Sequence, residues 1–532
     1  MRSAGLLDDA TARALEFPWL REQLAPASDY GQRIFAELVP FRPGEESLAS
    51  GRASQISKLS AALQLSQFDT LREVFRNVPD AAMAIARASM GDTLSDANFL
   101  ELQRFFDACE RVDAIGVPAG LQPTADEAVS ACARAIELGR AGKFGFYLDD
   151  RFDETLARAR GGFERAQAEY DAVRGRAAAR VAELLDREIA GNEFIVMRSD
   201  LKGTLPQGVR VVREAPTYFL CELDADEATL AALQRRDEAA TTVAEAEEAV
   251  RARLSHVIRS YAAALDLAAR RFGESDVMVA AARFSKTFDC VAPAYSSEKL
   301  QVVYDGGRFL PLAVELERDG RAFTAVSISL DDIAVLTGPN MGGKSVVLRT
   351  SGFIAVCAAF GVPVPAVSAS VGLFDEITWL GVGADEDFGG LLSSFAREVL
   401  RFRDMLGRTR ERRFVLMDEF ARTTTPREGR ALLIAVIERL RLLRAVGLSA
   451  THLAGIAPAA AVRHFAVRGL RGIPEKPATS DLSAALATLA ASMDYTIEEI
   501  EDESERRSDA IALAALLGLD SELIASAYDE LT

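Results

Sequence analysis

Histidine and tryptophan are scarce in this sequence, with three and two residues among 532. Three histidines (His256, His452 and His464) leave little material for a metal centre built on imidazole. Five cysteines are scattered without a Cys-x-x-Cys spacing. This spacing argues against a zinc site and against a disulfide framework, and it is typical of reduced thiols in a cytosolic protein.

Positive charge is also in short supply. Lysine and arginine total 61 residues against 79 acidic residues, so the formal net charge is −18. Such a chain repels nucleic acid on average, and any contact with DNA would need a local basic patch. Hydrophobic residues at 49% are nonetheless ordinary for a folded globular protein, and a chain of this length predicts two to four domains.

Long uninterrupted apolar segments are nearly absent as well. The N-terminus is acidic and lacks a long apolar core, so no secretory signal is expected. Residues 351–371 carry no charge, but Pro363 and Pro365 interrupt them. They predict a buried helix followed by a strand rather than a membrane span. We therefore expect a cytoplasmic protein with no membrane partner.

Residues 1 to about 290 are predicted to be almost wholly helical. Two segments, around residues 163–184 and 250–265, place apolar side chains at three- and four-residue steps. Each helix could extend over about forty residues, a rod of about 60 Å. Between them, β-branched runs punctuated by glycine and proline predict a small β tip at about residues 190–223. This layout describes a lever arm; an ordinary helical hairpin is the alternative, and periodicity alone favours the hairpin.

Beyond residue 310, strand-like and helical patterns alternate, as in a parallel sheet with crossover helices. The strand-like runs are residues 325–330, 333–337, 414–417 and 446–450. The run at 333–337 leads into Gly-Pro-Asn-Met-Gly-Gly-Lys-Ser, the G-x-x-x-x-G-K-[ST] pattern between a strand and a helix. Its glycines let backbone N–H groups turn towards phosphates at the positive end of that helix.

This phosphate loop predicts binding of ATP and Mg²⁺. Lys344 is placed to reach the β- and γ-phosphates, and the Ser345 hydroxyl to ligate Mg²⁺, which prefers oxygen ligands. The residues predicted to bind the cofactor here are Gly338, Pro339, Asn340, Met341, Gly342, Gly343, Lys344, Ser345 and Val346.

An acidic pair, Asp418 and Glu419, ends the strand-like run at 414–417. Asp418 would hold Mg²⁺ through water, and Glu419 would orient and polarise the attacking water, so the sequence predicts a magnesium-dependent ATPase. His452 follows the run at 446–450. A histidine at the carboxyl edge of a sheet can sense the γ-phosphate; a histidine with a purely structural role is the alternative.

These motifs, in this order, resemble the MutS family of ATPases of DNA mismatch repair. Residues 337–345 match that family's phosphate loop letter for letter, and residues 416–429 resemble its LMDE-x-GRGT-x-x-x-DG segment. Residues 393–398, Ser-Ser-Phe-x-x-Glu, resemble its S-T-F-x-x-E signature, and residues 450–452 its Ala-Thr-His. The chain departs from the family pattern at Ala421-Arg-Thr-Thr, which stands in place of GRGT, and at Ser394, which stands in place of threonine.

The resemblance implies a multidomain fold. An all-α lever domain with a β tip would precede an α/β P-loop ATPase domain with a parallel sheet of ABC type and a helical dimerisation segment. It also implies that Phe323 lies against adenine and that Ser393 completes the ATP site of a partner subunit in trans. That partner would be a second copy or a paralogue. The predicted domains are residues 1–40, 41–290, 291–480 and 481–532.

Two kinds of client remain open. We find no N-terminal mismatch-reading or connector domain in the sequence, so the chain resembles a truncated form of the family. A clamp on duplex or branched DNA is the commoner function in the superfamily. The alternative is a protein client, because one truncated MutS-like group is the ATPase partner that reactivates cobalamin-dependent lysine aminomutase. Cations of the tip could contact phosphates or form a solvated face, since acidic neighbours offset them: Arg198, Lys202, Arg210 and Arg213.

Overall fold

The computed structural model is a multidomain protein, largely helical and with several sheets. It describes residues 1–125, 127–141, 145–189, 191, 193–201, 203–339, 343–381, 394–470, 493–501, 511, 514–515 and 519–530. Two compact units divide the chain: Met1–Asn77 with Ile115–Leu121 and Phe272–Thr532, and Val78–Ala114 with Gln122–Arg271. The N-terminal 77 residues thus belong to the unit that carries the phosphate loop. The four domain bounds given above stay a prediction.

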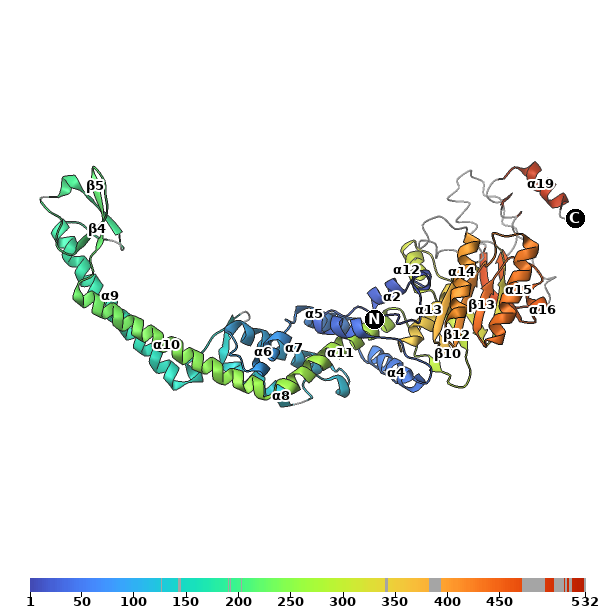
Figure 1. Cartoon of the computed structure of the whole chain (residues 1–532), viewed down its shortest axis with the longest axis horizontal. Coiled ribbons are helices and arrows are strands. Elements are labelled where there is room, and N and C mark those ends of the chain that lie inside the picture. The colour runs from blue at the N-terminus through green and yellow to red at the C-terminus, as the bar shows by residue number, and fades with distance from the viewer. Residues whose placement is uncertain are drawn as a thin grey trace. The chain divides into compact units, whose positions relative to one another are not determined.

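A six-stranded sheet forms the centre of the first unit (Figure 1). Its first five strands pair in parallel, and the last one is antiparallel to its neighbour. The two strands expected at residues 333–337 and 446–450 have the bounds predicted from the sequence. In spatial order the strands are β11 (Glu376–Gly381), β12 (Arg413–Asp418), β13 (Val446–Ala450), β9 (Ile333–Thr337), β14 (Arg463–Leu470) and β15 (Met493–Glu499).

Strand β15 corrects one expectation from the sequence. Residues 481–532 were predicted to be helical, yet Met493–Glu499 forms a strand at the edge of this sheet. From Tyr495 to Glu498 its side chains are partly buried and exposed in turn, and Ile497 pairs with Val467 of β14. Such alternation suits an edge strand with one covered face. Helix α19 (Ser521–Asp529) also follows this strand, and the Asp520 carboxylate accepts hydrogen bonds from N–H groups of its first turn.

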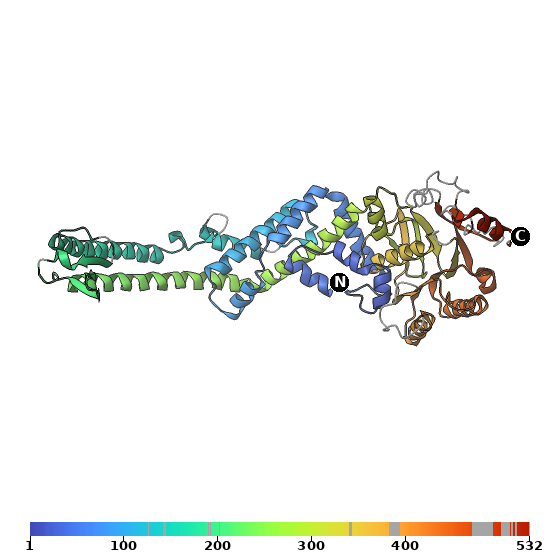
Figure 2. The same ribbon diagram turned by 90° about the horizontal axis from the view of Figure 1, so that it is seen from above.

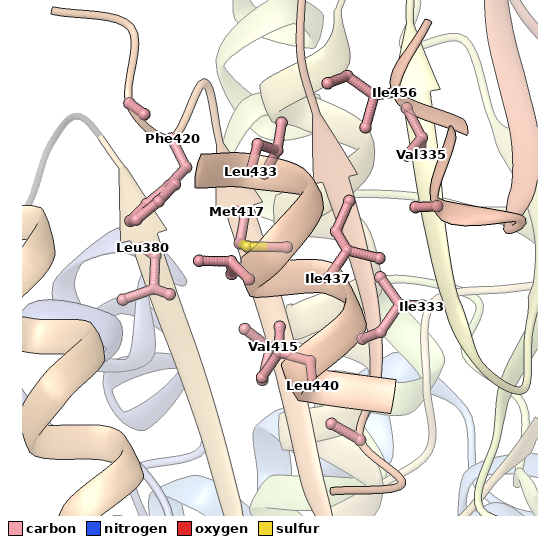
Figure 3. Close-up of a cluster of buried hydrophobic side chains, with 14 of the residues drawn as sticks. Ile333, Val335, Leu380, Val415, Met417, Phe420, Leu433, Ile437, Leu440 and Ile456 are labelled. Carbon is pink, nitrogen blue, oxygen red and sulfur yellow. The ribbon is translucent and has the colours of Figure 1, made fainter. Parts of the chain in front are cut away.

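Alternate side chains of β12 pack on the two faces of the sheet. Val415 and Met417 lie in a buried cluster with α15 (Pro426–Leu442) and α16 (Ile456–Ala460). Figure 3 shows Leu433, Ile437 and Leu440 of α15 lying against this strand. Leu416 points the other way, to Gly352 of α13 (Lys344–Ala359). A Cβ atom added at Gly352 would lie 2.8 Å from Leu416 Cδ1, so a larger residue there would force the packed side chains to shift.

The uncharged residues 351–371 form the buried end of α13 and then strand β10 (Ser368–Val371), as expected. Strand β10 belongs to a second sheet, with the order β6 (Ala294–Tyr295), β10, β7 (Val302–Gly307), β8 (Val326–Leu330). The helix α13 contacts β7 of this sheet as well as β12. Among the residues that the structure describes, no helix has both the length and the apolar character needed to cross a membrane.

The N-terminal segment covers the free edge of strand β11. The Leu6 carbonyl accepts a hydrogen bond from Ile377 N at 2.8 Å. Thr11 Oγ1, in α1 (Asp9–Ala14), accepts one from Trp379 N at 3.0 Å. These contacts satisfy two backbone N–H groups that would otherwise lie at an open sheet edge. The segment continues through α2 (Phe17–Gln23) and α3 (Asp29–Glu37), and Phe17 of α2 stacks on Phe360 after α13.

The second unit contains two long helices and a β tip. The helices α9 (Glu154–Leu185) and α10 (Glu227–Ser260) lie side by side (Figures 1 and 2). They have 32 and 34 residues, about 50 Å each and shorter than the forty residues expected. Between them, β3 (Glu193–Met197), β5 (Tyr218–Leu223) and β4 (Val209–Glu214) form an antiparallel sheet in that order. The predicted tip is therefore present, and Lys202 lies outside the described residues.

Shorter helices complete the two units. In the first unit, α4 (Glu46–Ala62) and α5 (Leu65–Asn77) follow α3, and Phe75 of α5 meets Phe272 at 5.1 Å between ring centroids. Asp276 of α11 (Ala262–Thr287) is buried and accepts hydrogen bonds from Ala27 N, Ser28 N and the Ser28 hydroxyl. Burial raises the pKa of this carboxyl despite those bonds. In the second unit are α6 (Ala82–Met90), α7 (Asp96–Ile115) and α8 (Glu127–Ile136).

Candidate functional site

Three parallel strands of the six-stranded sheet end at one edge. Asp418, the last residue of β12, is the register partner of Ala450, and Ala450 is the partner of Leu336 in β9. The segments that follow these strands are the acidic pair, the Thr451-His452 turn and the phosphate loop. These three segments are distant from one another in the sequence, and the order of strands in the sheet brings them to the same place.

The phosphate loop leads directly into helix α13. Gly343 has φ of 82°, a left-handed conformation that glycine adopts without the strain of a Cβ atom, and α13 begins at Lys344. The residue before the helix, Gly343, has no side chain that could cap it, and the first turn carries no acidic residue. The N–H groups and the positive dipole end at the start of a helix favour an anion there. Asn340, Met341 and Gly342 lie outside the described residues.

Lys344 lies within the loop rather than in solvent. Its side chain is only 5% exposed, and Nζ donates hydrogen bonds to Gly338 O at 3.0 Å and to Pro339 O at 3.1 Å. Glu419 Oε1 lies 4.0 Å from the same nitrogen. A buried ammonium group needs anionic or carbonyl partners, and the loop supplies carbonyl oxygens while the acidic pair supplies charge. The lysine thus links the loop to the end of β12.

Asp418 is a buried carboxylate, 8% exposed. Burial raises its pKa above the ordinary value, while a hydrogen bond with Ser345 and the positive charges of Arg349 and Lys344 act in the opposite direction. A hydroxyl and a carboxylate side by side form an all-oxygen donor set, which suits Mg²⁺. The raised pKa indicates a carboxylate that its protein neighbours do not fully stabilise, as expected of a group that binds a cation.

We predict that Asp418→Asn stabilises the nucleotide-free protein at neutral pH. The raised pKa means that the folded state holds a proton that the unfolded state has released. The free energy of unfolding therefore falls as the pH rises through the interval between the two pKa values. Asparagine does not titrate, so the free energy of unfolding of the variant does not fall in this way. Thermal melting from pH 4 to 8 should show the variant's advantage growing with pH; an advantage confined to acidic pH would contradict the prediction.

Glu419 lies in a tightly held turn. Its φ is 54°, its N–H donates to Ala450 O at 3.0 Å, and its Oε2 accepts a hydrogen bond from Arg422 Nη1 at 2.9 Å. A left-handed conformation is costly for a residue with a long side chain, so the surrounding contacts hold it in place. The side chain is largely buried beside Lys344, at the edge where the phosphate loop ends.

The structure assigns different environments to two histidines. His452 follows β13 at the same edge and is exposed. His464 is buried on β14, and its Nε2 is 2.8 Å from the hydroxyl of Thr337, the residue before the phosphate loop. Sequence reasoning singled out His452 and overlooked His464. No local signal would have found it, because the contact depends on β14 lying next to β9 in the sheet.

The other residues predicted to bind the nucleotide lie in different parts of the chain. Phe323 is partly buried in the stretch before β8, and Val346 is partly buried in the first turn of α13. Ser393 lies outside the described residues. Tyr495 of β15 is a further neighbour that sequence reasoning missed: a Cβ placed on Gly343 would lie 3.1 Å from its Cδ1. This aromatic ring therefore covers the last glycine of the loop, and it does so through the strand that was predicted to be helical.

Comparison with known proteins gives a family for this region. The profile of the family described as MutS domain V matches residues 334–532. Curated relatives include two proteins named Endonuclease MutS2. The one from Streptococcus pneumoniae serotype 19F (strain G54) is 32% identical over 202 residues, 37% of this chain and 25% of the relative. The one from Pelotomaculum thermopropionicum is 27% identical over 288 residues, 53% of this chain and 33% of the relative.

The matched parts thus span about a quarter to a third of the length of these relatives. The profile match begins within β9 and takes in the phosphate loop, Asp418, Glu419, His452 and His464. The same residues carry the resemblance seen in the sequence. Over residues 334–532, the chain therefore carries a region similar to domain V of the MutS family.

Proposed function

We propose that this protein is a magnesium-dependent ATPase of the MutS type. The observation that carries the proposal is the position of Lys344, buried between the carbonyl oxygens of the phosphate loop and the carboxylate of Glu419. One cation thereby lies between the phosphate loop and the pair of acidic residues at the end of β12. The match of residues 334–532 to domain V of the MutS family supports the same activity.

The residues present fit ATP and Mg²⁺. Gly338, Gly343 and the first turn of α13 would bind the phosphates, with Lys344 on the β- and γ-phosphates. Ser345 and Asp418 would hold the metal, which would neutralise charge that develops on the phosphates. Glu419 would orient a water molecule and accept its proton. Its buried position and the hydrogen bond from Arg422 would keep the carboxylate in place for this role.

The proposed function requires binding to DNA and to a partner subunit. MutS-family proteins act as dimers on DNA, and the curated relatives are named as endonucleases. We propose that two copies, or this chain and a paralogue, form two composite ATP sites that Ser393 completes in trans. Phe323 would contact adenine and His452 would sense the γ-phosphate. ATP binding and hydrolysis would then move the α9 and α10 arm as a clamp on duplex or branched DNA.

DNA binding should show a strong dependence on salt. Contacts with phosphates release counterions, so affinity for labelled duplex, mismatched and branched DNA is expected to fall steeply between 50 and 200 mM salt, by about tenfold or more. ATP should change this affinity relative to ADP. Fluorescence anisotropy with each nucleotide at both salt concentrations measures the effect. Absence of binding at 50 mM salt would contradict the DNA assignment and would leave the ATPase assignment standing.

A protein client is the second candidate, and the tip favours it. Two cations of the tip are paired with carboxylates, Arg198 with Glu214 and Arg210 with Glu222. Ile195, Met197 and Val212 are exposed on the same small sheet. Paired cations offer less attraction to DNA phosphates, and exposed apolar side chains favour contact with protein. A client such as an aminomutase would be identified by co-purification and by stimulation of ATP turnover.

A further inference from the structure

Helix α14 (Ser394–Gly407) makes a buried hydrogen bond to the turn that carries Glu419. Glu398 Oε2 accepts from Ala421 N at 2.8 Å, and the Glu398 residue is 8% exposed. The bond joins two segments that are separated by 23 positions in sequence. A carboxylate buried this deeply is stable only when it receives hydrogen bonds, and an N–H group as buried as that of Ala421 also needs a partner.

The bonded residue has an unfavourable backbone conformation. Ala421 has φ of 63°, in the left-handed region that alanine rarely adopts, and Glu419 two residues earlier has φ of 54°. The turn therefore contains two left-handed residues that are not glycine. Such a conformation persists only when surrounding contacts fix it. The hydrogen bond from Ala421 to Glu398 is one of those contacts, and its loss would let the turn relax.

Apolar contacts attach α14 to the same turn. Phe420, between the two left-handed residues, is buried in the cluster of Figure 3, and Phe402 of α14 lies 6.2 Å from it between ring centroids. Met405 of α14 belongs to the cluster as well. Helix and turn therefore share one packed interior, and a shift of α14 would displace the turn.

The middle of α14 is also bound to the N-terminal segment. Arg401 Nη2 donates to both oxygens of Asp8 at 3.2 Å, and both side chains are largely buried. Arg401 lies one helical turn after Glu398, so the two residues project from neighbouring positions on α14. Asp8 also caps α1, whose Thr11 covers the edge of β11. A series of contacts thus runs from the N-terminal segment to Glu419.

We infer that Glu398 is the positioning residue for Glu419, and that the Asp8–Arg401 ion pair supports it by fixing α14. This inference rests on the proposed ATPase function. Glu398 would not contact the nucleotide. It would hold Ala421 in its left-handed conformation, and so keep the Glu419 carboxylate beside Lys344, where a water molecule can be activated.

The test compares substitutions at Glu398 by ATP turnover and by the Kd for Mg-ADP. In Glu398→Ala we expect kcat to fall about tenfold or more, since a charged hydrogen bond is lost, while the Kd changes less than about twofold. Glu398→Gln keeps an acceptor oxygen and should recover most of kcat. Asp8→Asn, which preserves the helix cap, should lower kcat about two- to fivefold. Asp404→Ala, an exposed position on the same helix, is the matched control.

A second pair of variants covers the case in which Glu398→Ala does not fold. Glu398→Met keeps the side-chain length without an acceptor and should lower kcat in the same way. Ala421→Gly in that background should restore part of it, because glycine adopts φ near +60° without support. The inference would be overturned if Glu398→Met left kcat unchanged. It would also be overturned if Glu398→Gln lowered kcat as much as Glu398→Met does. Wild-type protein without turnover would instead contradict the proposed function.

Discussion

Glu419→Gln is expected to abolish ATP turnover while nucleotide binding survives. The carboxylate is the proposed acceptor of the water's proton, and an amide cannot take that proton. General-base catalysis contributes about 10²- to 10⁴-fold, and kcat should fall by that factor. Glutamine has nearly the same size and can still accept the hydrogen bond from Arg422, so the turn should keep its conformation. Single-turnover hydrolysis and a Kd for Mg-ATP, measured on the same preparation, separate the two effects.

The control for this variant is Glu438→Gln. Glu438 is exposed on α15, far along the helix from the turn, and the substitution makes the same change of charge. Its turnover should equal that of the unsubstituted protein. Turnover by Glu419→Gln within a few-fold of the unsubstituted rate would exclude Glu419 as the base, and would direct attention to another acceptor at this sheet edge.

Lys344→Ala is expected to weaken Mg-ATP binding by about 10- to 100-fold. The ammonium group makes charge-assisted hydrogen bonds, each of about 1.5 to 3 kcal/mol, and tenfold in affinity corresponds to about 1.4 kcal/mol. The buried lysine also compensates the carboxylate of Glu419 at 4.0 Å, so the nucleotide-free protein should lose some stability as well. Equilibrium binding of a fluorescent ATP analogue with and without Mg²⁺ measures the loss.

Lys58→Ala provides the matched control for the lysine. Lys58 is exposed on α4, and its removal changes the net charge equally. Its affinity for the nucleotide should not change. If Lys344→Ala bound Mg-ATP as tightly as Lys58→Ala, the phosphate loop would not be the nucleotide site, and the proposed function would fall with it.

Local sequence was sufficient for the elements that carry the chemistry. Ile333–Thr337 is five buried residues followed by a glycine-rich loop, and the structure has a strand and a helix N-terminus there. Asp418 ends β12 in the same way. Each of these features is a pattern within a few neighbouring residues, and such a local pattern is typical of a strand or a helix. The residue roles at this site stay predictions for the experiments above to test.

Contacts between distant segments could not be found in this way. His464 rather than His452 bonds to Thr337, because β14 lies beside β9. Residues 493–499 form a strand because β14 offers an edge for pairing, although the surrounding segment was predicted to be helical. The sequence pattern at these positions is short, and a short apolar run is compatible with either structure until a neighbour is available.

The sequence by itself determined the strand–loop–helix unit to which we assign the triphosphate, since the spacing of glycines, lysine and serine on it is a local property. The tertiary structure decided which other residues meet them. Asp8 lies 393 positions from Arg401, and Glu398 reaches Ala421 from a different helix. The order of strands in the sheet and the packing of α14 determine these contacts. Both depend on how the whole chain buries its apolar surface.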